Sequence, residues 1–395
     1  MVDGADFRRI SRARVLGSLV ASGRASRAEL AATSGLSRAT VSRVVEDLIA
    51  EGTIREREAI RRPRGRSVTP LELVGERGVV CGVDLGATTV RIALADLSCR
   101  PLGVERAATP NDRGAAGLAR WLAQRIRRLC REVADEAELW ATAVGVPGVV
   151  HPETRGIRLA PNLPGIAGTT FVASLERHLD GAVSLDNDAN FALLGEMHFG
   201  AARGLSSAVM FTIGTGVGAG VAVDSRLQRG PSGFVGEFGN MVIGSGSSTL
   251  ESVVAGPALV RAAARRGLRI SSPADVFLRR APSPLREVRD HALQALLVAL
   301  SATTVAYEPQ IVVLGGGVAP PLGPWLPGLR RRLAGATSAP PQLVLSELGD
   351  LAGTAGALAK ALENAYTHMD LVFAEIDGIL PASYRDEILD LLRRS

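Results

Sequence analysis

The sequence predicts an α/β protein in which a small, basic, mainly helical module precedes a larger fold made of two similar lobes. Residues 7–51 contain three segments with helical periodicity and capping residues between them. The rest of the 395-residue chain contains three glycine-rich loops, each at the end of an apolar, strand-like run. We therefore expect one domain over residues 1–75 and a second over residues 76–395.

The charge distribution sets the N-terminal segment apart from the remainder. Residues 1–77 contain fifteen arginines and ten acidic residues, and this excess equals the formal net charge of +5 of the whole chain. A basic segment attached to a neutral remainder is typical of a DNA-binding module.

Several classes of protein are excluded or disfavoured by composition. The chain contains no uninterrupted run of 18 apolar residues, so we expect no membrane span. Its first residues are polar and acidic, unlike a secretory leader. The three cysteines, Cys81, Cys99 and Cys130, are far apart and form no CxxC pair, which argues against a disulfide framework. We expect a cytoplasmic protein.

The N-terminal module has the sequence pattern of a helix-turn-helix. Apolar residues follow one helical stripe from Phe7 to Val20. Ser26, followed three residues later by Glu29, predicts a capping box that opens a short second helix. After the glycine-bearing turn 33–36, Ser37 is placed to cap a third helix that runs to about Glu51.

The third helix divides into a buried face and a polar face. We expect its buried face to contain Leu36, Val41, Val44 or Val45, and Leu48. Arginine, threonine and serine side chains on its other face are suited to base edges and phosphates in the major groove. The predicted DNA contacts of this helix are Ser37, Arg38, Thr40, Ser42 and Arg43.

A basic hairpin is predicted to follow the three helices. Two strand-like runs, Thr53–Arg57 and Ser67–Val74, flank a loop with four arginines: Arg61, Arg62, Arg64 and Arg66. A charged surface hairpin without a role is the alternative. The position of the hairpin directly after a helix-turn-helix favours a wing that contacts DNA. We therefore include these four arginines among the predicted DNA contacts.

The three glycine loops of the larger region are candidate phosphate-binding loops. Backbone N–H groups in such loops can face phosphate oxygens, and a nearby carboxylate can hold a metal-bound phosphate. Each loop alone could be a plain hairpin, but three in this order predict a duplicated α/β fold with a cleft between two lobes. The candidate nucleotide-binding residues are Asp84, Gly86, Thr88, Gly214, Thr215, Gly216, Gly315 and Gly316.

Six ordered segments of this region carry a specific resemblance. They are Val144-Gly145-Val146-Pro147-Gly148, Pro161-Asn162-Leu163-Pro164-Gly165, Asp186-Asn187-Asp188-Ala189-Asn190, Gly214-Thr215-Gly216-Val217-Gly218, the run from Gly230 to Asn240, and Leu250-Glu251. The chain resembles the ROK family of repressors, open reading frames and kinases, whose repressor branch carries an N-terminal winged helix. The resemblance implies a two-lobed, actin-like ATPase fold, with a small lobe over about 78–185 plus the C-terminal helix and a large lobe over about 186–360.

The resemblance also implies a sugar site between the lobes. The sugar-binding residues would be Asn162, Asn187, Asp188, Glu237 and Glu251. In a kinase, Asp188 would take the proton from the attacked hydroxyl, and Mg²⁺ near Asp84 would position ATP. Structural roles are the alternative, because Asn162 could brace a turn between prolines and Asp186 or Asp188 could cap a helix that begins near Ala189.

Two departures from the family pattern shape the expected chemistry. Asn240 stands where the family commonly has a zinc-binding histidine, and the usual cysteine cluster is absent from residues 244–249. We therefore expect no zinc, a looser loop before Glu251, and a sugar contact from Asn240. In the first glycine loop, Ala87 replaces a glycine and Thr89 stands where many kinases have lysine, which disfavours efficient use of ATP.

Together these features predict a sugar-responsive DNA-binding regulator of carbohydrate metabolism genes, a repressor in the family's sense. We expect a homodimer or tetramer on a roughly palindromic DNA operator, with no required cofactor. The alternative is an ATP-dependent sugar kinase with an accessory N-terminal module and Mg-ATP as its cofactor. A sugar-binding protein that uses neither DNA nor ATP has little support, given the predicted wing.

Overall fold

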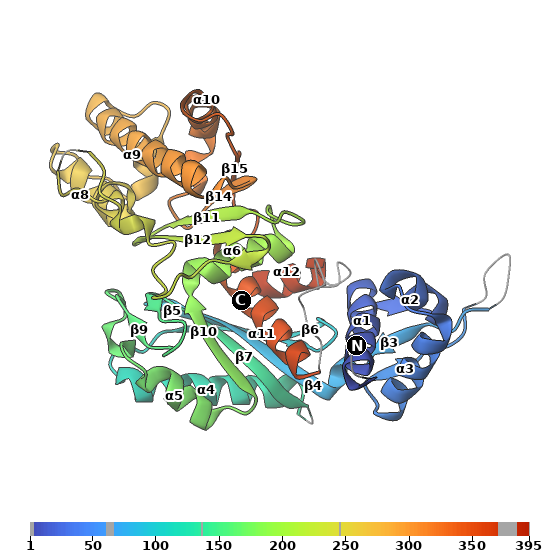
Figure 1. Cartoon of the computed structure of the whole chain (residues 1–395). Coiled ribbons are helices and arrows are strands. Elements are labelled where there is room, and N and C mark those ends of the chain that lie inside the picture. The colour runs from blue at the N-terminus through green and yellow to red at the C-terminus, as the bar shows by residue number, and fades with distance from the viewer. Residues whose placement is uncertain (1–3, 61–66, 136, 245, 370–384, 395) are drawn as a thin grey trace. The chain divides into compact units, whose positions relative to one another are not determined.

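The computed structural model describes residues 4–60, 67–135, 137–244, 246–369 and 385–394 (Figure 1). Contacts between residues divide the chain into two compact units. The first comprises Met1–Val144, Asn162–Leu185 and Ala357–Ser395, and the second comprises Gly145–Pro161 and Asp186–Gly356. Each unit is described by itself.

The N-terminal module of the first unit is a three-helix bundle with a small sheet. Its elements are α1 (Gly4–Ser22), β1 (Arg24–Ala25), α2 (Arg27–Ser34), α3 (Arg38–Ala50), β2 (Ile54–Glu56) and β3 (Leu71–Leu73), with strand order β1-β3-β2. Leu16, Leu30 and Leu48 are fully buried, one from each helix. This arrangement confirms the predicted winged helix-turn-helix, although both strands are shorter than the predicted runs.

The rest of the first unit is built on a five-stranded sheet. Its strands are β4 (Gly78–Leu85), β5 (Thr89–Asp96), β6 (Pro101–Ala108), β7 (Glu138–Val146) and β10 (Ala182–Asn187), in the order β10-β7-β4-β5-β6. Its helices are α4 (Gly114–Val133), α5 (Thr170–His178), α11 (Ala352–His368) and α12 (Arg385–Arg393). A Cβ atom on Gly82 would lie 2.4 Å from the backbone nitrogen of Leu358, so the glycine is needed for α11 to pack directly on β4.

The second unit has a sheet of its own (Figure 1), which contains five strands. The strands are β11 (Ala208–Ile213), β12 (Val217–Val223), β13 (Arg226–Leu227), β14 (Ile311–Gly315) and β15 (Gln342–Leu345), in the order β13-β12-β11-β14-β15. The helices are α6 (Asp188–Phe199), α7 (Leu250–Val254), α8 (Gly256–Ala264), α9 (Ser283–Tyr307) and α10 (Leu326–Ala336). A short hairpin of β8 (Val149–Val150) and β9 (Ile157–Arg158) completes the unit.

The two five-stranded sheets are topological repeats. In each sheet the first three strands in sequence form an antiparallel meander. The fourth strand lies beside the first, and the fifth lies beside the fourth. In the second sheet, β14 pairs parallel with β11, and β15 pairs parallel with β14. This repeat confirms the predicted duplicated α/β fold.

The hydrophobic core of the second unit lies between its sheet and α9. Alternate residues of β11, namely Val209, Phe211 and Ile213, face this core with Leu296 and Leu300 of α9. The opposite face of the sheet receives α6. Among the described residues of the whole chain, no helix is long and apolar enough to cross a membrane.

Candidate functional sites

Local capping fixes the helix-turn-helix. Ser26 forms the predicted capping box, because its hydroxyl accepts from the Glu29 backbone N–H while the Glu29 carboxylate accepts from the Ser26 N–H at 2.8 Å. Gly35 ends α2 with φ of +69°, a conformation that favours glycine. Ser37 then caps α3 by accepting from the Thr40 N–H at 3.1 Å. The turn between the two helices is therefore fixed by side chains of its own sequence.

The polar face of α3 is available for contact with a partner. Val41, Val45 and Leu48 are fully buried against the module. Arg38 and Arg43 are exposed, and the described part of the chain provides no hydrogen bond or ion pair to either guanidinium. Of the other predicted DNA contacts on α3, Ser37 is exposed and Thr40 and Ser42 are half-buried. The predicted wing arginines Arg61, Arg62, Arg64 and Arg66 lie outside the described residues.

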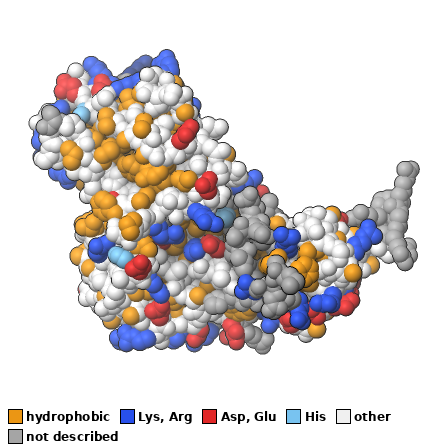
Figure 2. Space-filling view, viewed as in Figure 1, with side chains coloured by type: hydrophobic (Ala, Val, Ile, Leu, Met, Phe, Trp, Pro, Cys, Tyr) orange, Lys and Arg blue, Asp and Glu red, His pale blue; other side chains and the backbone are white. Residues whose placement is uncertain are grey.

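Other arginines of this module are neutralised within it. The carboxylate of Glu72, which is only 10% exposed, pairs with Arg24 at 3.0 Å, Arg55 at 2.8 Å and Arg57 at 3.3 Å. Arg27 pairs with Glu56 at 2.6 Å. Basic and acidic side chains accordingly lie side by side on the face of the module seen in Figure 2. The contrast with Arg38 and Arg43 favours α3 as the surface for an anionic partner.

In the second unit, close backbone packing brings the start of α6 onto β12. A Cβ atom on Gly218 would lie 3.2 Å from the Cβ of Ala189, and one on Gly220 would lie 2.6 Å from the Ala189 carbonyl oxygen. Because both strand positions are glycine, the helix can approach this closely. Asn187 and Asp188, which immediately precede Ala189, are thereby placed at the beginning of β12.

The segment that carries Glu237 lies against the same strand. Gly236 has φ of +98° and accepts a hydrogen bond from the Ala219 N–H at 2.9 Å, and a Cβ atom there would lie 2.0 Å from the Ala219 carbonyl oxygen. Phe238 packs in the core, with its ring 5.4 Å from that of Phe211. The neighbours of Glu237 on both sides are thus anchored, and the predicted sugar-binding carboxylate is held near the start of β12.

Glu251 reaches the same place from α7. The Thr249 hydroxyl caps α7 by accepting from the Ser252 N–H. One Glu251 carboxylate oxygen accepts from the Val217 N–H at 2.9 Å. Burial raises the pKa of Glu237, and the negative charge of Glu251 raises that pKa further, so the two carboxylates lie within electrostatic range. The structure therefore brings together Asn187, Asp188, Glu237 and Glu251.

A buried charged group supports the start of α6. Asp186 is 4% exposed, and its carboxylate accepts from the Asn187 N–H at 2.8 Å and from the Asn190 amide at 2.7 Å. Its second oxygen pairs with the Arg229 guanidinium at 2.6 and 2.7 Å. This pair ties the start of α6 to the segment that leads to Glu237. Arg229 was not predicted from the sequence. Its position directly before the Gly230–Asn240 segment is the feature that could have identified it.

The cap of α6 differs from the alternative drawn from the sequence. That alternative assigned the cap to Asp186 or Asp188, but the residue in the cap position is Asn187. Its side-chain oxygen accepts from the Ala189 N–H at 2.9 Å, and its amide donates to the Gly148 carbonyl at 3.0 Å. An Asp188 carboxylate oxygen also accepts from the Ala189 N–H, at 2.8 Å. Both predicted sugar contacts thus have local structural partners as well.

Asn240 and the segment after it are held by local hydrogen bonds. The Asn240 amide donates to a Glu237 carboxylate oxygen at 3.3 Å. The segment 244–249, which lacks cysteine, is flanked by a bridge between Val242 and Thr249 and a backbone bond from Ile243 to Ser248 at 2.9 Å. Among the described residues, no three His, Cys, Asp or Glu side chains are grouped to hold a metal ion.

Two of the candidate phosphate loops meet in the second unit. Because β11 and β14 are parallel and Thr212 pairs with Gly315, the loops that follow them lie at the same edge of the sheet. Gly316 has φ of +81°, and a Cβ atom there would lie 2.5 Å from the Ile213 carbonyl oxygen. The loop residues Gly214, Thr215 and Gly216 are closed by a bond from the Gly214 N–H to the Gly216 carbonyl at 2.9 Å. This edge is where ligands bind in many α/β sheets.

The remaining predicted site residues belong to the first unit. Asp84 lies on β4 and pairs in register with Arg91 of β5, while Gly86 and Thr88 form the turn between these strands. The Thr88 side chain is exposed. Asn162 is also exposed, in the turn before a short 3₁₀ helix that begins at Pro164.

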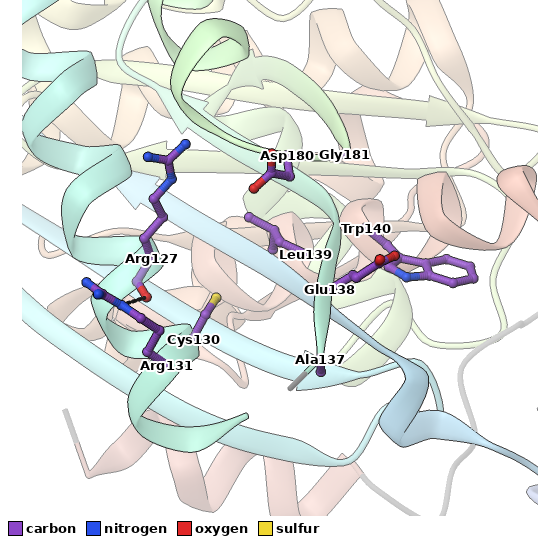
Figure 3. A pocket seen from close by; sticks show the side chains of 9 residues that line it. All are labelled: Arg127, Cys130, Arg131, Ala137, Glu138, Leu139, Trp140, Asp180 and Gly181. Atoms are coloured by element: carbon purple, nitrogen blue, oxygen red, sulfur yellow. Dashed lines mark hydrogen bonds between the residues drawn. The ribbon is translucent and has the colours of Figure 1, made fainter. Parts of the chain in front are cut away.

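The first unit also contains a pocket that the sequence interpretation did not include. It has a volume of about 970 Å³, and the residues that line it come mainly from α4 and β7 (Figure 3). Arg127 and Arg131 lie at one side, and Glu138 and Asp180 supply the opposite charge. Burial raises the pKa of the Cys130 thiol to about 11, so this lining residue stays protonated and unreactive at neutral pH.

Comparison with known proteins agrees with these features. Residues 80–364 match the model of the ROK family, and residues 8–55 match a winged helix-turn-helix DNA-binding model. The family match covers more than half of the chain. This protein belongs to the ROK family, and its N-terminal module is a winged helix-turn-helix of the DNA-binding type.

Individual relatives include both regulators and kinases. The xylose repressor of Caldicellulosiruptor bescii is 28% identical over 238 residues, which are 60% of this chain and 59% of the repressor. The crystal structure of a ROK family transcriptional regulator, a homologue of the E. coli MLC protein, has a TM-score of 0.77 and 20% identity, covering 92% of this chain and 99% of that one. The ROK hexokinase of Thermus thermophilus has a TM-score of 0.62 and 32% identity, covering 74% of this chain and 99% of that one.

Proposed function

We propose that this protein is a sugar-responsive transcriptional repressor that binds a DNA operator through its winged helix-turn-helix. The observation that carries the proposal is the union, in one chain, of a ROK domain with a DNA-binding module whose recognition helix exposes Arg38 and Arg43. The likeness to a ROK transcriptional regulator over 92% of this chain supports the same overall plan. The repressor acts in the cytoplasm, where it has access to the chromosome.

The effector that we propose is a sugar or sugar derivative. Sugar hydroxyls both donate and accept hydrogen bonds, so clustered carboxylates and amides can bind them specifically. Asn187, Asp188, Glu237 and Glu251 provide such a cluster around the start of β12, and Asn240 can orient Glu237 or contact the sugar. A sugar with different affinities for the DNA-binding and non-binding forms then shifts their populations.

We also propose that the protein acts as a homodimer or tetramer. Helix-turn-helix regulators bind two half-sites about one helical turn apart, so a palindromic operator requires two modules. No metal or nucleotide is required for this role.

The test is selection of genomic DNA fragments by the purified protein at near-physiological salt, because phosphate contacts depend on ionic strength. We expect enrichment of one symmetric sequence, and loss of that enrichment in Arg38→Ala/Arg43→Ala protein. Equal binding of all fragments by the wild type would contradict the proposal.

A sugar kinase is the second candidate. It is favoured by the likeness to a ROK hexokinase at 32% identity and by the presence of Asp188 and two glycine loops in the second unit. In this role, Asp188 takes the proton from the attacked sugar hydroxyl. ATP- and Mg²⁺-dependent phosphate transfer to a sugar, abolished in Asp188→Ala protein, would establish it.

A further inference from the structure

Two exposed apolar side chains lie on segments that adjoin the predicted sugar-binding residues of the second unit. Leu159 is 61% exposed and directly follows β9. Phe234 is 49% exposed and lies three residues before Glu237. Single exposed apolar residues are common on protein surfaces. The contacts of these two segments, however, lead to the same place.

The hairpin of β8 and β9 connects the two segments. The Arg158 guanidinium, at the end of β9, donates to the Ser232 carbonyl at 2.9 Å. A Cβ atom on Gly233 would lie 2.1 Å from the Val150 carbonyl oxygen of β8, so the loop packs directly on the hairpin. Each of the two exposed side chains therefore lies within two residues of a contact between the hairpin and the loop.

The same hairpin and loop are attached to the polar cluster. The Asn187 amide donates to the carbonyl of Gly148, immediately before β8, at 3.0 Å. A Cβ atom on Gly148 would lie 2.8 Å from the Arg158 carbonyl oxygen, which ties this point to the end of β9. In the loop, the Glu237 N–H donates to the Phe234 carbonyl at 3.3 Å. An apolar border is thus joined to the proposed sugar site through two of its members.

Leu159 has a backbone conformation that its side chain disfavours. Its φ of +51° lies in the left-handed region, which is unusual for a bulky residue. Because most of the side chain is exposed, burial offsets little of the cost. Such strained residues are found most often at sites that bind ligands. A bound molecule would use the apolar side chain that the fold leaves exposed.

The chemistry of this border differs from that of the polar cluster. Carboxylates and amides bind hydroxyl groups, whereas apolar side chains suit the C–H face of a sugar ring. The face of a phenyl ring is negative, and it attracts the C–H groups of a stacked ring. We propose that Phe234 and Leu159 bind the second ring of a disaccharide whose first ring occupies the polar cluster. The inference rests on the proposed function and names the class of its effector.

The test measures dissociation constants of the full-length protein by isothermal titration calorimetry. The probes are maltose, cellobiose, lactose, melibiose, xylobiose and diacetylchitobiose, each compared with the monosaccharides from which it is built. Phe234→Ala removes the proposed stacking ring, and Phe234→Tyr keeps it. Phe7→Ala is the matched control, since Phe7 is 53% exposed and belongs to the N-terminal module.

A second variant tests the border without touching the loop. Leu159→Gly removes the side chain at a φ that glycine adopts without strain, so the hairpin should keep its conformation. Leu278→Ala is its control, because Leu278 is a 57% exposed leucine of the same unit that lies outside the predicted sugar-binding set.

We expect the wild type to bind one disaccharide about 10-fold more tightly than its constituent monosaccharides, and Phe234→Ala to remove most of this difference. Leu159→Gly should reduce the difference, and Phe234→Tyr and both controls should preserve it. Monosaccharide affinity should stay as in the wild type in all variants.

Three results would overturn the inference. One is equal affinity of the wild type for disaccharides and monosaccharides, and another is a preference for a disaccharide that Phe234→Ala and Leu159→Gly both leave intact. The third is an equal loss of affinity for both kinds of sugar in Phe234→Ala, which would give the ring only a structural role in the loop. The proposed function fails separately, if the wild type binds no sugar of the panel or prefers no DNA sequence.

Discussion

The two repeated sheets differ at the loops between their first and second strands. In the first unit, the loop 86–88 is held by Thr109, whose hydroxyl donates to the Gly86 carbonyl at 2.8 Å and whose N–H donates to the Thr88 carbonyl at 3.0 Å. In the second unit, the loop 214–216 is held at two points. The Val217 N–H donates to the Glu251 carboxylate at 2.9 Å, and the N–H of Gly256, the first residue of α8, donates to the Gly214 carbonyl at 2.8 Å.

This difference shows how a repeated fold acquires unequal functions. The first loop is fixed by neutral groups of Thr109, directly after β6, whereas the second is fixed in part by a carboxylate from the predicted sugar-binding set. A sugar that draws Glu251 away from Val217 would therefore change the hydrogen bonding of the second loop. Charged groups in the second unit link the predicted sugar site to the glycine loop.

The largest effect is expected from removing the buried charge behind this site. Asp186→Ala leaves the Arg229 guanidinium and the start of α6 without their partner, which should lower the free energy of unfolding by about 3–5 kcal/mol. Asp390→Ala is the control, since its pair with Arg393 is more than 60% exposed on both sides and should cost less than about 1 kcal/mol. Urea denaturation of both variants gives the comparison, and similar losses in the two would refute the proposed support.

A backbone substitution in the second unit should have the next largest effect. Gly316→Ala places a methyl group 2.5–2.8 Å from backbone atoms of Ile213 at φ of +81°, so we expect a loss of about 3 kcal/mol. Gly317→Ala is the neighbouring control, because no atom lies within 4 Å of the added Cβ. Thermal unfolding measures both. Equal melting temperatures for the two variants would show that the loop is not packed as described.

The electrostatic link between the carboxylates can be tested by titration. Burial is the larger cause of the raised pKa of Glu237, and the negative charge of Glu251 is the smaller. Glu251→Gln should therefore lower the pKa of Glu237 without returning it to the ordinary value. A raised pKa means that the folded state binds the proton more tightly than the unfolded state, so stability falls as pH rises from the ordinary pKa through the raised one. The substitution should narrow this pH window.

Carboxyl-detected NMR titration of wild-type and Glu251→Gln protein measures the Glu237 midpoint directly. The expected change is a shift to lower pH in the variant. A midpoint that stays where it is in the wild type would contradict the proximity of the two carboxylates.

The smallest effect is expected in the loop of the first unit. Thr109→Val removes the hydroxyl that donates to Gly86 and should cost about 1 kcal/mol of unfolding free energy. Thr367→Val is a suitable control, since its exposed hydroxyl donates to the Glu363 carbonyl of its own helix. Chemical denaturation measures the free energy of unfolding of both variants. If Thr109→Val loses no more free energy than Thr367→Val, the Thr109 hydroxyl does not hold the loop.

The sequence predicted features that depend on nearby residues. Ser26 and Ser37 cap helices through partners three residues away, and the pattern of serine and glutamate is enough to identify the first of them. Strand bounds in the wing were predicted less well, because pairing between β2 and β3, rather than local propensity, determines where β2 ends. The cap of α6 was misassigned because three consecutive polar residues, 186–188, can each serve as a cap.

Contacts across the chain could not be predicted in the same way. The Asp186–Arg229 pair and the bond from Val217 to Glu251 join residues 43 and 34 positions apart, and no local pattern specifies either partner. The family resemblance identified Glu237 and Glu251 as a set but did not indicate that Glu251 also holds the glycine loop. Asn240 was predicted as a sugar contact, and nothing in the sequence indicated that its amide donates to Glu237.

Under the proposed function, sugar binding in the second unit controls DNA binding by the N-terminal module. The direct measurement is the dissociation constant of the selected operator in the presence of a panel of hexoses, pentoses and acetamido sugars, for wild-type and Asp188→Asn protein. We expect one class of sugar to weaken operator binding by the wild type about 10-fold or more, a coupling free energy of about 1.4 kcal/mol. Asp188→Asn protein should bind the operator equally well without responding. Sugar responses that are identical in the two proteins, or absent across the whole panel, would contradict the claim.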